Sequence, residues 1–280
     1  MKCPHYADPF FIDYVLKEDI GRGDITTRLI FKEKKIWKAE IKAKEELVLC
    51  GSELVSYIFG KIDETVEVKI LQVDGVRLRK GDIIAEISGD PASILTGERT
   101  VLNFLQRLSG VATLSSEFVK ALDPSSDTRI ADTRKTTPGW RTLEKYAVRT
   151  GGAVNHRFGL DDGIMIKDNH IVMAGSIGKA VSDVRKGAHH LLKIEVEVST
   201  IDQVYEAVSA GADVIMLDNM PVEMMKEAVH IINKKAVIEI SGGVTLSRIG
   251  ELSRVGANII SVGALTHSAV AKDINLTLYP

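Results

Sequence analysis

Cysteine, long apolar runs and a net charge of either sign are all nearly absent from this chain of 280 residues. The two cysteines, Cys3 and Cys50, show no CxxC spacing, which argues against a disulfide scaffold and a zinc ribbon. No apolar run approaches the roughly 20 residues needed to cross a bilayer, and the N-terminus lacks the apolar stretch of a signal peptide. The 36 basic and 38 acidic residues nearly cancel, so overall charge gives no reason to expect nucleic-acid or membrane binding. We therefore expect a cytoplasmic protein.

The first hundred residues contain short candidate strands separated by turn signals such as Asp74-Gly75. This pattern predicts a small antiparallel sheet. Between Thr96 and Ala121 the apolar residues recur at spacings of three and four, which predicts a helix with one apolar face. The expected strands cover residues 36–41, 66–73, 76–78 and 83–87.

After Pro124, short apolar strands alternate with helical stretches. The strand markers Val196, Leu217, Ile240 and Val262 are separated by 21, 23 and 22 residues, which is the period of a strand–loop–helix–loop unit. Such repeated units predict a parallel sheet. Polar residues or glycine follow every strand, which favours an α/β barrel, and no GxGxxG motif supports a Rossmann sheet. The seven expected strands cover residues 129–131, 153–155, 163–166, 192–198, 214–217, 237–240 and 259–262.

Basic side chains gather after three of these strands. Because the carboxyl ends of parallel strands meet at one edge, we expect these cations to converge on a multiply anionic small molecule. The cations alone leave open whether the anion carries carboxylates, phosphates or both. The five candidate residues are Arg134, Lys135, His156, Arg157 and Lys167.

Three carboxylates follow in the next two strands. Period-two alternation places Glu195 and Glu197 on one face of their strand, and Asp218 ends the strand after it. Inward acids beside a basic cluster suggest Mg²⁺ held jointly with a phosphate-bearing substrate. Pairing with a neighbouring lysine is an alternative interpretation, mainly for Glu195.

Glycine-rich loops end the last two strands and open helices. Glycine lets backbone amides approach a phosphate, and a helix N-terminus favours an anion. Two such loops at adjacent late strands predict a phosphate site. It consists of Ser241, Gly242, Gly243, Gly263 and Ala264.

Together these segments resemble the quinolinate phosphoribosyltransferase family over nearly the whole chain and in the same order. Trp140 stands where this family is expected to have Leu, beside the loop rather than in the site. The resemblance rests on EDIGRGDITT (18–27), ERTVLNFLQRLSGVAT (98–113), ADTRKTTPGWRTLEKYAVRTGGAVNHRFGLDDGIMIKDNH (131–170), IEVEV (194–198), MLDN (216–219), ISGGV (240–244) and SVGALTHS (261–268).

The resemblance implies an α/β fold: an N-terminal α/β sandwich domain followed by an incomplete, seven-stranded α/β barrel of the type II phosphoribosyltransferase kind. The first domain would cover residues 1–112 and be joined by the tail 270–280, and the barrel would cover residues 113–269. The implied reaction joins quinolinate and 5-phosphoribosyl-1-pyrophosphate, with Mg²⁺, to give nicotinate mononucleotide, pyrophosphate and CO₂ in NAD biosynthesis. The implied assembly is a homodimer, or a ring of dimers, with shared active sites.

The resemblance also implies a role for each candidate residue. Quinolinate carboxylates would be held by Arg134, His156, Arg157, Lys167 and, from the neighbouring subunit, Arg99. Lys135 would meet the pyrophosphate, and Glu197 and Asp218 would bind the ribose hydroxyls and Mg²⁺ with support from Glu195. The same five loop residues, Ser241, Gly242, Gly243, Gly263 and Ala264, would surround the 5-phosphate.

Three alternatives to this activity differ in chemistry. A related protein encoded with molybdate-transport systems shares the fold, and turnover of quinolinate would separate the two. A barrel lyase or isomerase acting on a sugar phosphate would share the phosphate loops without needing five converging cations. A non-catalytic carrier or anion-binding module would need a modifiable lysine at a hairpin tip, and the motif for one is not apparent.

Overall fold

The computed structural model describes residues 2–31 and 35–280, which form two compact units. The first contains the residues up to Ser116 together with Thr136–Gly152 and Leu265–Pro280. The second contains Glu117–Lys135 and Ala153–Ala264. The segment Thr136–Gly152, which the resemblance assigns to the barrel, therefore groups with the first unit. Within the described ranges, no helix is both long and apolar enough to span a membrane.

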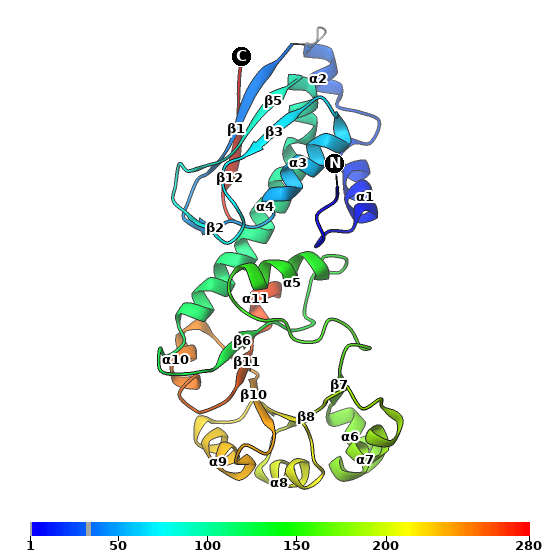
Figure 1. Ribbon diagram of the computed structural model, residues 1–280, viewed down its shortest axis with the longest axis vertical. Coiled ribbons are helices and arrows are strands. Elements are labelled where there is room, and N and C mark those ends of the chain that lie inside the picture. Colours follow the sequence, from blue (N-terminus) through cyan, green and yellow to red (C-terminus); the bar gives the residue numbers. More distant parts are fainter. Residues whose placement is uncertain (1, 32–34) are drawn as a thin grey trace. The chain divides into compact units, whose positions relative to one another are not determined.

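An antiparallel sheet of four strands organises the first unit, in the order β12–β1–β5–β3 (Figure 1). Helices α3 and α4 lie along one of its faces. The strand β12 comes from the C-terminal tail and pairs with β1, which brings the tail back to this unit. The sheet strands are β1 (Trp37–Ala43), β3 (Glu67–Ile70), β5 (Ile83–Gly89) and β12 (Ile274–Tyr279), and β2 (Leu47–Val48) pairs with β4 (Arg77–Leu78). The helices are α1 (Pro9–Ile20), α2 (Ile25–Ile30), α3 (Ser52–Ile62), α4 (Pro91–Lys120) and α5 (Arg141–Thr150).

Apolar and polar residues alternate along β1, so one face of this sheet is buried and the other is exposed to solvent. Ala39, Ile41 and Ala43 are buried, whereas Lys38 lies on the exposed face. Helix α4 also packs closely against the tail, since a Cβ on Gly110 would lie 2.3 Å from the carbonyl oxygen of Val270. Glycine is therefore needed at that crossing.

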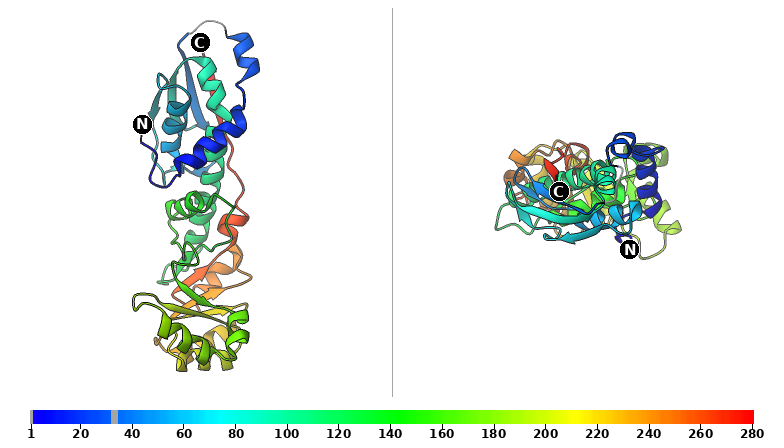
Figure 2. Two further views of the ribbon diagram at one scale, coloured as in Figure 1. Left: turned by 90° about the vertical axis from the view of Figure 1, so that its right-hand side faces the viewer. Right: turned by 90° about the horizontal axis from the view of Figure 1, so that it is seen from above.

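A parallel sheet of six strands forms the second unit, in the order β6–β11–β10–β9–β8–β7. Its helices cover one face of the sheet (Figure 2). The expected seventh strand is reduced to a single parallel bridge between Ala131 and Val154. The α/β fold with an open barrel is thus confirmed. The strands are β6 (Arg129–Ala131), β7 (Ile164–Ile166), β8 (Ile194–Val198), β9 (Val214–Asp218), β10 (Val237–Ser241) and β11 (Ile259–Ser261). The helices are α6 (Asp168–Ala174), α7 (Ile177–Gly187), α8 (Ile201–Ser209), α9 (Val222–Ile232), the 3-10 turn η1 (Leu246–Arg248), α10 (Ile249–Leu252) and α11 (Ala264–His267).

The strand β8 shows how the fold presents acids to the interior of the sheet. Val196 and Val198 are buried on the face that receives the helices, and Glu195 and Glu197 occupy the opposite face. The neighbouring strand β9 pairs in register and ends at Asp218, opposite Ser241 of β10. Side chains of different strands are therefore brought together at the carboxyl ends.

Candidate functional site

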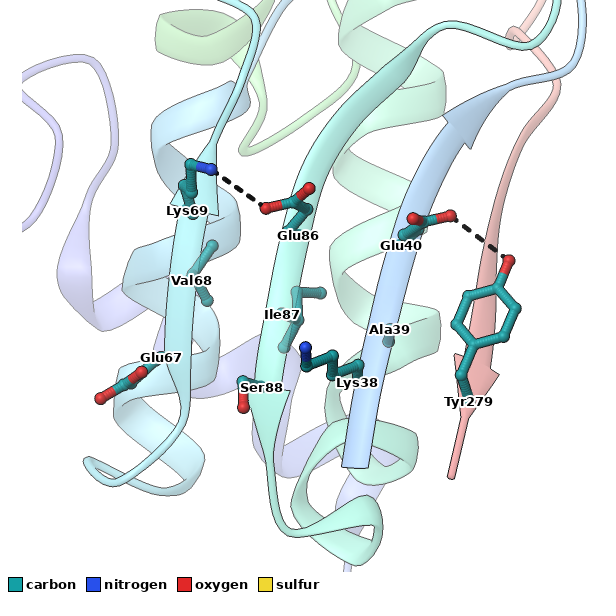
Figure 3. Close-up of a pocket in the computed structure, with 10 residues that line it drawn as sticks. All are labelled: Lys38, Ala39, Glu40, Glu67, Val68, Lys69, Glu86, Ile87, Ser88 and Tyr279. Atoms are coloured by element: carbon teal, nitrogen blue, oxygen red, sulfur yellow. Dashed lines mark hydrogen bonds and ion pairs between the residues drawn. The ribbon is translucent and has the colours of Figure 1, made fainter. Parts of the chain in front are cut away.

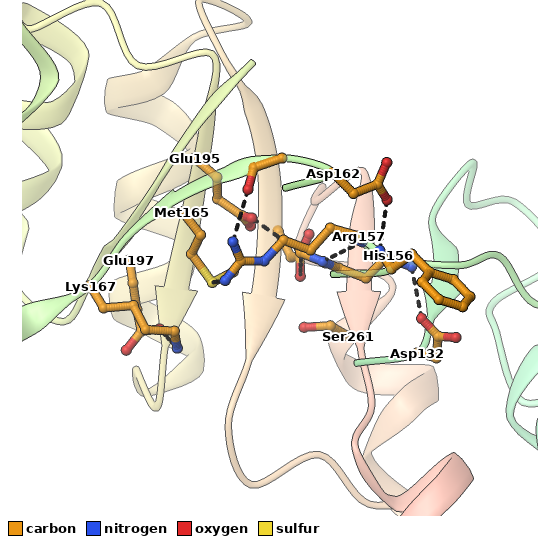
Figure 4. Close-up of polar contacts among 12 residues, drawn as sticks. Asp132, His156, Arg157, Asp162, Met165, Lys167, Glu195, Glu197 and Ser261 are labelled. Carbon is orange, nitrogen blue, oxygen red and sulfur yellow. Dashed lines mark hydrogen bonds and ion pairs between the residues drawn. The ribbon is translucent and has the colours of Figure 1, made fainter. Parts of the chain in front are cut away.

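The predicted cations and acids contact one another at the carboxyl ends of β7 and β8. Lys167, directly after β7, forms an ion pair of 2.6 Å with Glu197 of β8, and Figure 4 shows the two side chains together. Both are candidate site residues, and in this pair each side chain neutralises the charge of the other. The pairing lets either charge be exchanged for one on a ligand.

His156 is bound to its surroundings through both ring nitrogens. Its Nδ1 accepts a hydrogen bond of 2.7 Å from the backbone N–H of Arg157. Its Nε2 lies 3.1 Å from Glu195 Oε2 and 3.5 Å from Oε1 of Glu239 on β10. The ring thus faces two buried acids, and its role toward a substrate carboxylate stays a prediction.

Asp132 fixes the segment that carries these residues. This fully buried carboxylate follows β6 and accepts hydrogen bonds from Asn155 Nδ2 (2.7 Å) and from the backbone N–H of His156 (2.8 Å), as Figure 4 shows for His156. It immediately precedes Thr133-Arg134-Lys135. Asp132 therefore joins two strand-end segments that carry four of the predicted cations. Asp132 was not among the residues that the sequence singled out.

Arg157 lies half-buried with its guanidinium held in place. Nη1 donates to the Gly163 carbonyl oxygen at 2.8 Å, and Nη2 contacts the sulfur of Met165 at 3.6 Å. Burial, and then the positive charge of Arg134, lower the pKa of Arg157. Arg157 also lines a hollow of about 550 Å³ together with Met165 and His170. Two neighbouring arginines that repel one another suit an anion with more than one negative charge.

The glycine loop after β10 is shaped by Asn219. This residue has a φ of 53°, and its side-chain amide donates to Asp218 at 2.9 Å. Gly242 has a φ of 84°, and a Cβ there would lie 2.3 Å from Asn219 Oδ1, so only glycine fits. Arg248 donates to the carbonyl oxygen of Gly243 at 3.0 Å. Sequence reasoning missed Arg248 because it lies five residues beyond the glycine pair.

The other predicted residues lie in less confined places. Lys135 is exposed, Arg134 is half-buried, and Gly263 and Ala264 follow β11 in the second unit. Arg99 is exposed on α4 in the first unit. The structure of one chain therefore assigns Arg99 to a different unit from every other candidate residue.

A second hollow, of about 830 Å³, lies on the exposed face of the antiparallel sheet and contains none of the predicted residues (Figure 3). Two polar contacts join side chains that line it. Lys69 contacts Glu86 at 3.2 Å, and the Tyr279 hydroxyl donates to Glu40 at 3.3 Å. These pairs are solvent-exposed, which is typical of a hydrated sheet face.

Glu239 is another buried acid that sequence reasoning did not select. Its side chain is 2% exposed. One of its carboxylate oxygens lies within 4.8 Å of a carboxylate oxygen of Glu195 and of a ring nitrogen of His156. Burial and the charge of Glu195 raise the pKa of Glu239 to about 7. The only signal in the sequence was one glutamate at an alternating position in VIEIS.

Comparisons with known proteins agree over nearly the whole chain. The family model for the N-terminal domain of quinolinate phosphoribosyl transferase matches residues 24–109, and the model for its C-terminal domain matches residues 111–277. A Bacillus subtilis protein named "Probable nicotinate-nucleotide pyrophosphorylase (carboxylating)" is 48% identical over 95% of this chain and 91% of its own. A mitochondrial quinolinate phosphoribosyltransferase (decarboxylating) of Nicotiana tabacum is 39% identical over 98% and 83%.

Solved structures give the same result. The crystal structure of NadC from Streptococcus pyogenes has a TM-score of 0.93 and is 41% identical, covering 98% of this chain and 99% of that one. With both domain models matched and these relatives covering nearly its full length, the chain belongs to the quinolinate phosphoribosyltransferase family.

Proposed function

We propose that this protein transfers the phosphoribosyl group of 5-phosphoribosyl-1-pyrophosphate to quinolinate, with loss of CO₂, in NAD biosynthesis. The products are nicotinate mononucleotide, pyrophosphate and CO₂. The observation that carries this proposal is the contact of predicted quinolinate and ribose residues at one sheet edge, where Lys167 pairs with Glu197. Family membership over both domains supports the same activity.

Quinolinate is a dianion, and the second unit offers it several cations. Arg157 and Lys167 are held at the strand ends, and burial, followed by the positive charge of Arg134, lowers the pKa of Arg157. A substrate carboxylate relieves that repulsion and replaces Glu197 as the partner of Lys167. Binding of quinolinate therefore releases Glu197 for the ribose.

The acids on β8 and β9 suit Mg²⁺ and ribose. Glu197 and Asp218 supply carboxylate oxygens, the donor type that Mg²⁺ prefers. When bound, Mg²⁺ would neutralise charge on the pyrophosphate. Asn219 orients Asp218 through its hydrogen bond, and the loop around Gly242 lets backbone amides approach the 5-phosphate.

The chain's residues stabilise charge as the reaction proceeds. Departure of pyrophosphate leaves positive charge on the ribose, which the carboxylates of Glu197 and Asp218 oppose, while Lys135 stabilises the leaving group. The pyridine nitrogen then bonds to C1 of the ribose. The resulting pyridinium accepts the electron pair released when the adjacent carboxylate leaves as CO₂, and C2 takes up a proton.

Arg99 completes the site from a second copy of the chain. It is exposed on α4 and lies in a different unit from the other cations. A two-fold dimer makes the exchange reciprocal, so that each copy supplies its Arg99 to the other. The proposed assembly is a homodimer or a ring of such dimers.

The direct test is a reaction with quinolinate labelled in its 2-carboxylate, phosphoribosyl pyrophosphate and Mg²⁺. We expect one labelled CO₂ and one pyrophosphate for each nicotinate mononucleotide. Absence of nicotinate mononucleotide with a folded protein would refute the activity and favour the related protein of molybdate-transport systems. Asp218→Ala protein is the matched control for contaminating activity.

A further inference from the structure

The pairing between β6 and the segment around Val154 ends at a side chain. It begins as a regular parallel ladder, in which the Val154 N–H donates to the Ile130 carbonyl oxygen at 2.8 Å and the Asp132 N–H donates to the Val154 carbonyl oxygen at 3.1 Å. The next donor of such a ladder, the His156 N–H, would pair with the backbone carbonyl of Asp132. Here the His156 N–H donates to the side-chain Oδ1 of Asp132 at 2.8 Å (Figure 4). The carboxylate thus acts in place of its own carbonyl, next to the single bridge between Ala131 and Val154.

This carboxylate is buried and held by a second donor. Asp132 is 0% exposed, and its Oδ2 accepts a hydrogen bond of 2.7 Å from Asn155 Nδ2. A buried carboxylate that leaves either donor loses a hydrogen bond without gaining water, which is costly. The two bonds therefore fix Asn155 and His156 relative to the end of β6.

The segment fixed in this way carries two of the predicted quinolinate residues. The Arg157 N–H donates to His156 Nδ1 at 2.7 Å, and the Arg157 guanidinium donates to the Gly163 carbonyl oxygen at 2.8 Å. The position of His156 therefore decides where the backbone of Arg157 lies. A side-chain acceptor extends further from the backbone than a carbonyl oxygen does, so the spacing between the two segments is set by the length of the side chain at position 132.

Supply of negative charge to a basic stretch is the alternative role for Asp132. Charge alone would be supplied equally by glutamate, which is one methylene longer. The bonds to one backbone N–H and one side-chain amide instead depend on length and direction. Geometry and charge can therefore be separated by experiment.

We propose that Asp132 is a positioning residue for quinolinate, which sets the places of His156 and Arg157 through the His156 backbone. The inference rests on the proposed function, in which these two residues hold substrate carboxylates. Asp132 is fully buried and does not touch the substrate itself. A displaced cation binds a rigid dianion less well, because the two carboxylates of quinolinate have a fixed separation.

The first test is Asp132→Glu, which keeps the charge and changes the length. We expect KM for quinolinate to rise roughly tenfold or more, while KM for phosphoribosyl pyrophosphate changes by less than about twofold. Asp123→Glu is the matched control, because Asp123 accepts the Ser125 N–H at 2.9 Å in the same unit but precedes β6. Both of its KM values should equal those of wild type.

The second test exchanges the two hydrogen-bonding partners in Asp132→Asn/Asn155→Asp. The amide oxygen at position 132 then accepts the His156 N–H, and the amide NH₂ donates to the carboxylate at position 155. Both bonds are kept, so KM for quinolinate should stay within about threefold of wild type. An unchanged KM for quinolinate in Asp132→Glu would overturn the proposal. Equal increases of both KM values would also overturn it, because a merely structural role weakens both substrates alike.

A third measurement does not depend on activity. Backbone hydrogen exchange of unliganded wild type and Asp132→Ala compares the His156 amide with the Val154 amide, which bonds to Ile130 in both proteins. We expect His156 exchange to be roughly tenfold faster or more in the variant, with Val154 unchanged. Equal His156 exchange in the two proteins would refute the positioning role even if quinolinate is turned over. The expected exchange in a wild type that does not turn over quinolinate would refute only the proposed function.

Discussion

The two units place acidic side chains in opposite environments, exposed to solvent in the first unit and buried in the second. On the antiparallel sheet, Lys69 and Glu86 pair across an exposed face, with side chains 72% and 48% exposed. In the parallel sheet, Glu195 and Glu239 are buried, and an oxygen of each carboxyl group lies within 4.8 Å of one of the other. Exposed pairs contribute about 0–1 kcal/mol to stability, whereas a buried charge requires a partner or a proton.

The difference lies in topology rather than composition. Antiparallel strands display alternate side chains to water on one face, so their charges are solvated where they stand. Parallel strands covered by helices direct their polar side chains to the interior and to the carboxyl ends, where Lys167 meets Glu197. Only the second arrangement concentrates charge enough to bind and transform a multiply charged substrate.

The largest effect should come from replacing an acid in the second unit. We expect Asp218→Ala to lower kcat by roughly 100-fold or more, because this carboxylate opposes charge that develops only in the transition state.

Lys167→Ala should instead raise KM for quinolinate by roughly tenfold or more, since its partner is a ground-state carboxylate. Steady-state kinetics with each substrate varied will separate these effects. Unchanged kcat in the first variant and unchanged KM in the second would contradict the assigned roles.

A mixed dimer tests whether the first unit contributes to the partner's site. At quinolinate concentrations far below their raised KM values, Arg99→Ala and Lys167→Ala should each be nearly inactive, but in a mixed dimer one site retains Lys167 and receives an intact Arg99. Random exchange at equal amounts makes half of the dimers mixed, so activity should recover to roughly a quarter of wild type. Differentially tagged, co-expressed chains allow the mixed dimers to be isolated and assayed. Mixed dimers that form but remain inactive would contradict the shared site.

The buried pair should also make stability depend on pH. The pKa of Glu239 is raised from 4.5 to about 7, so over that range the folded protein keeps a proton that the unfolded chain loses. Wild-type stability should therefore fall as pH rises through this window. Relative to wild type, Glu239→Gln should gain about 2–3 kcal/mol between pH 5 and pH 8. Urea unfolding at both pH values provides the measurement, and an unchanged difference would argue against a protonated Glu239.

The smallest effect should come from the exposed pair. Glu86→Gln should change the free energy of unfolding by less than about 0.5 kcal/mol and leave quinolinate kinetics unchanged. Urea unfolding and steady-state assays at low and high salt measure both. A loss above about 1.5 kcal/mol would show that the comparison between the two faces is too simple.

Much of the fold could be predicted because the regular spacing of apolar segments indicates where the strands of the parallel sheet lie. The strand β6 matches its predicted bounds, and β9 and β10 each extend one residue beyond the predicted strand. The seventh strand is reduced to a single parallel bridge between Val154 and Ala131. Alternation could place Glu195 and Glu197 on one face but could not show which partner each would meet.

The part of the site that sequence missed depends on contacts between distant segments. Glu239 looks like one polar residue in an apolar strand, and its meaning appears only when β8 brings Glu195 to it. Asp132 likewise gains its role from the backbone of His156, 24 positions away. For His156, the residue type predicted a hydrogen bond to a substrate carboxylate. In the structure its ring contacts the buried acids Glu195 and Glu239.

Selectivity between quinolinate and nicotinic acid, measured as kcat/KM in the same assay, tests the central claim most directly. The cations around Arg157 and Lys167 suit two carboxylates, and a monocarboxylate leaves part of this charge desolvated and unpaired. We expect quinolinate to be favoured by roughly 10³-fold or more. Comparable efficiency with both acids would contradict the account.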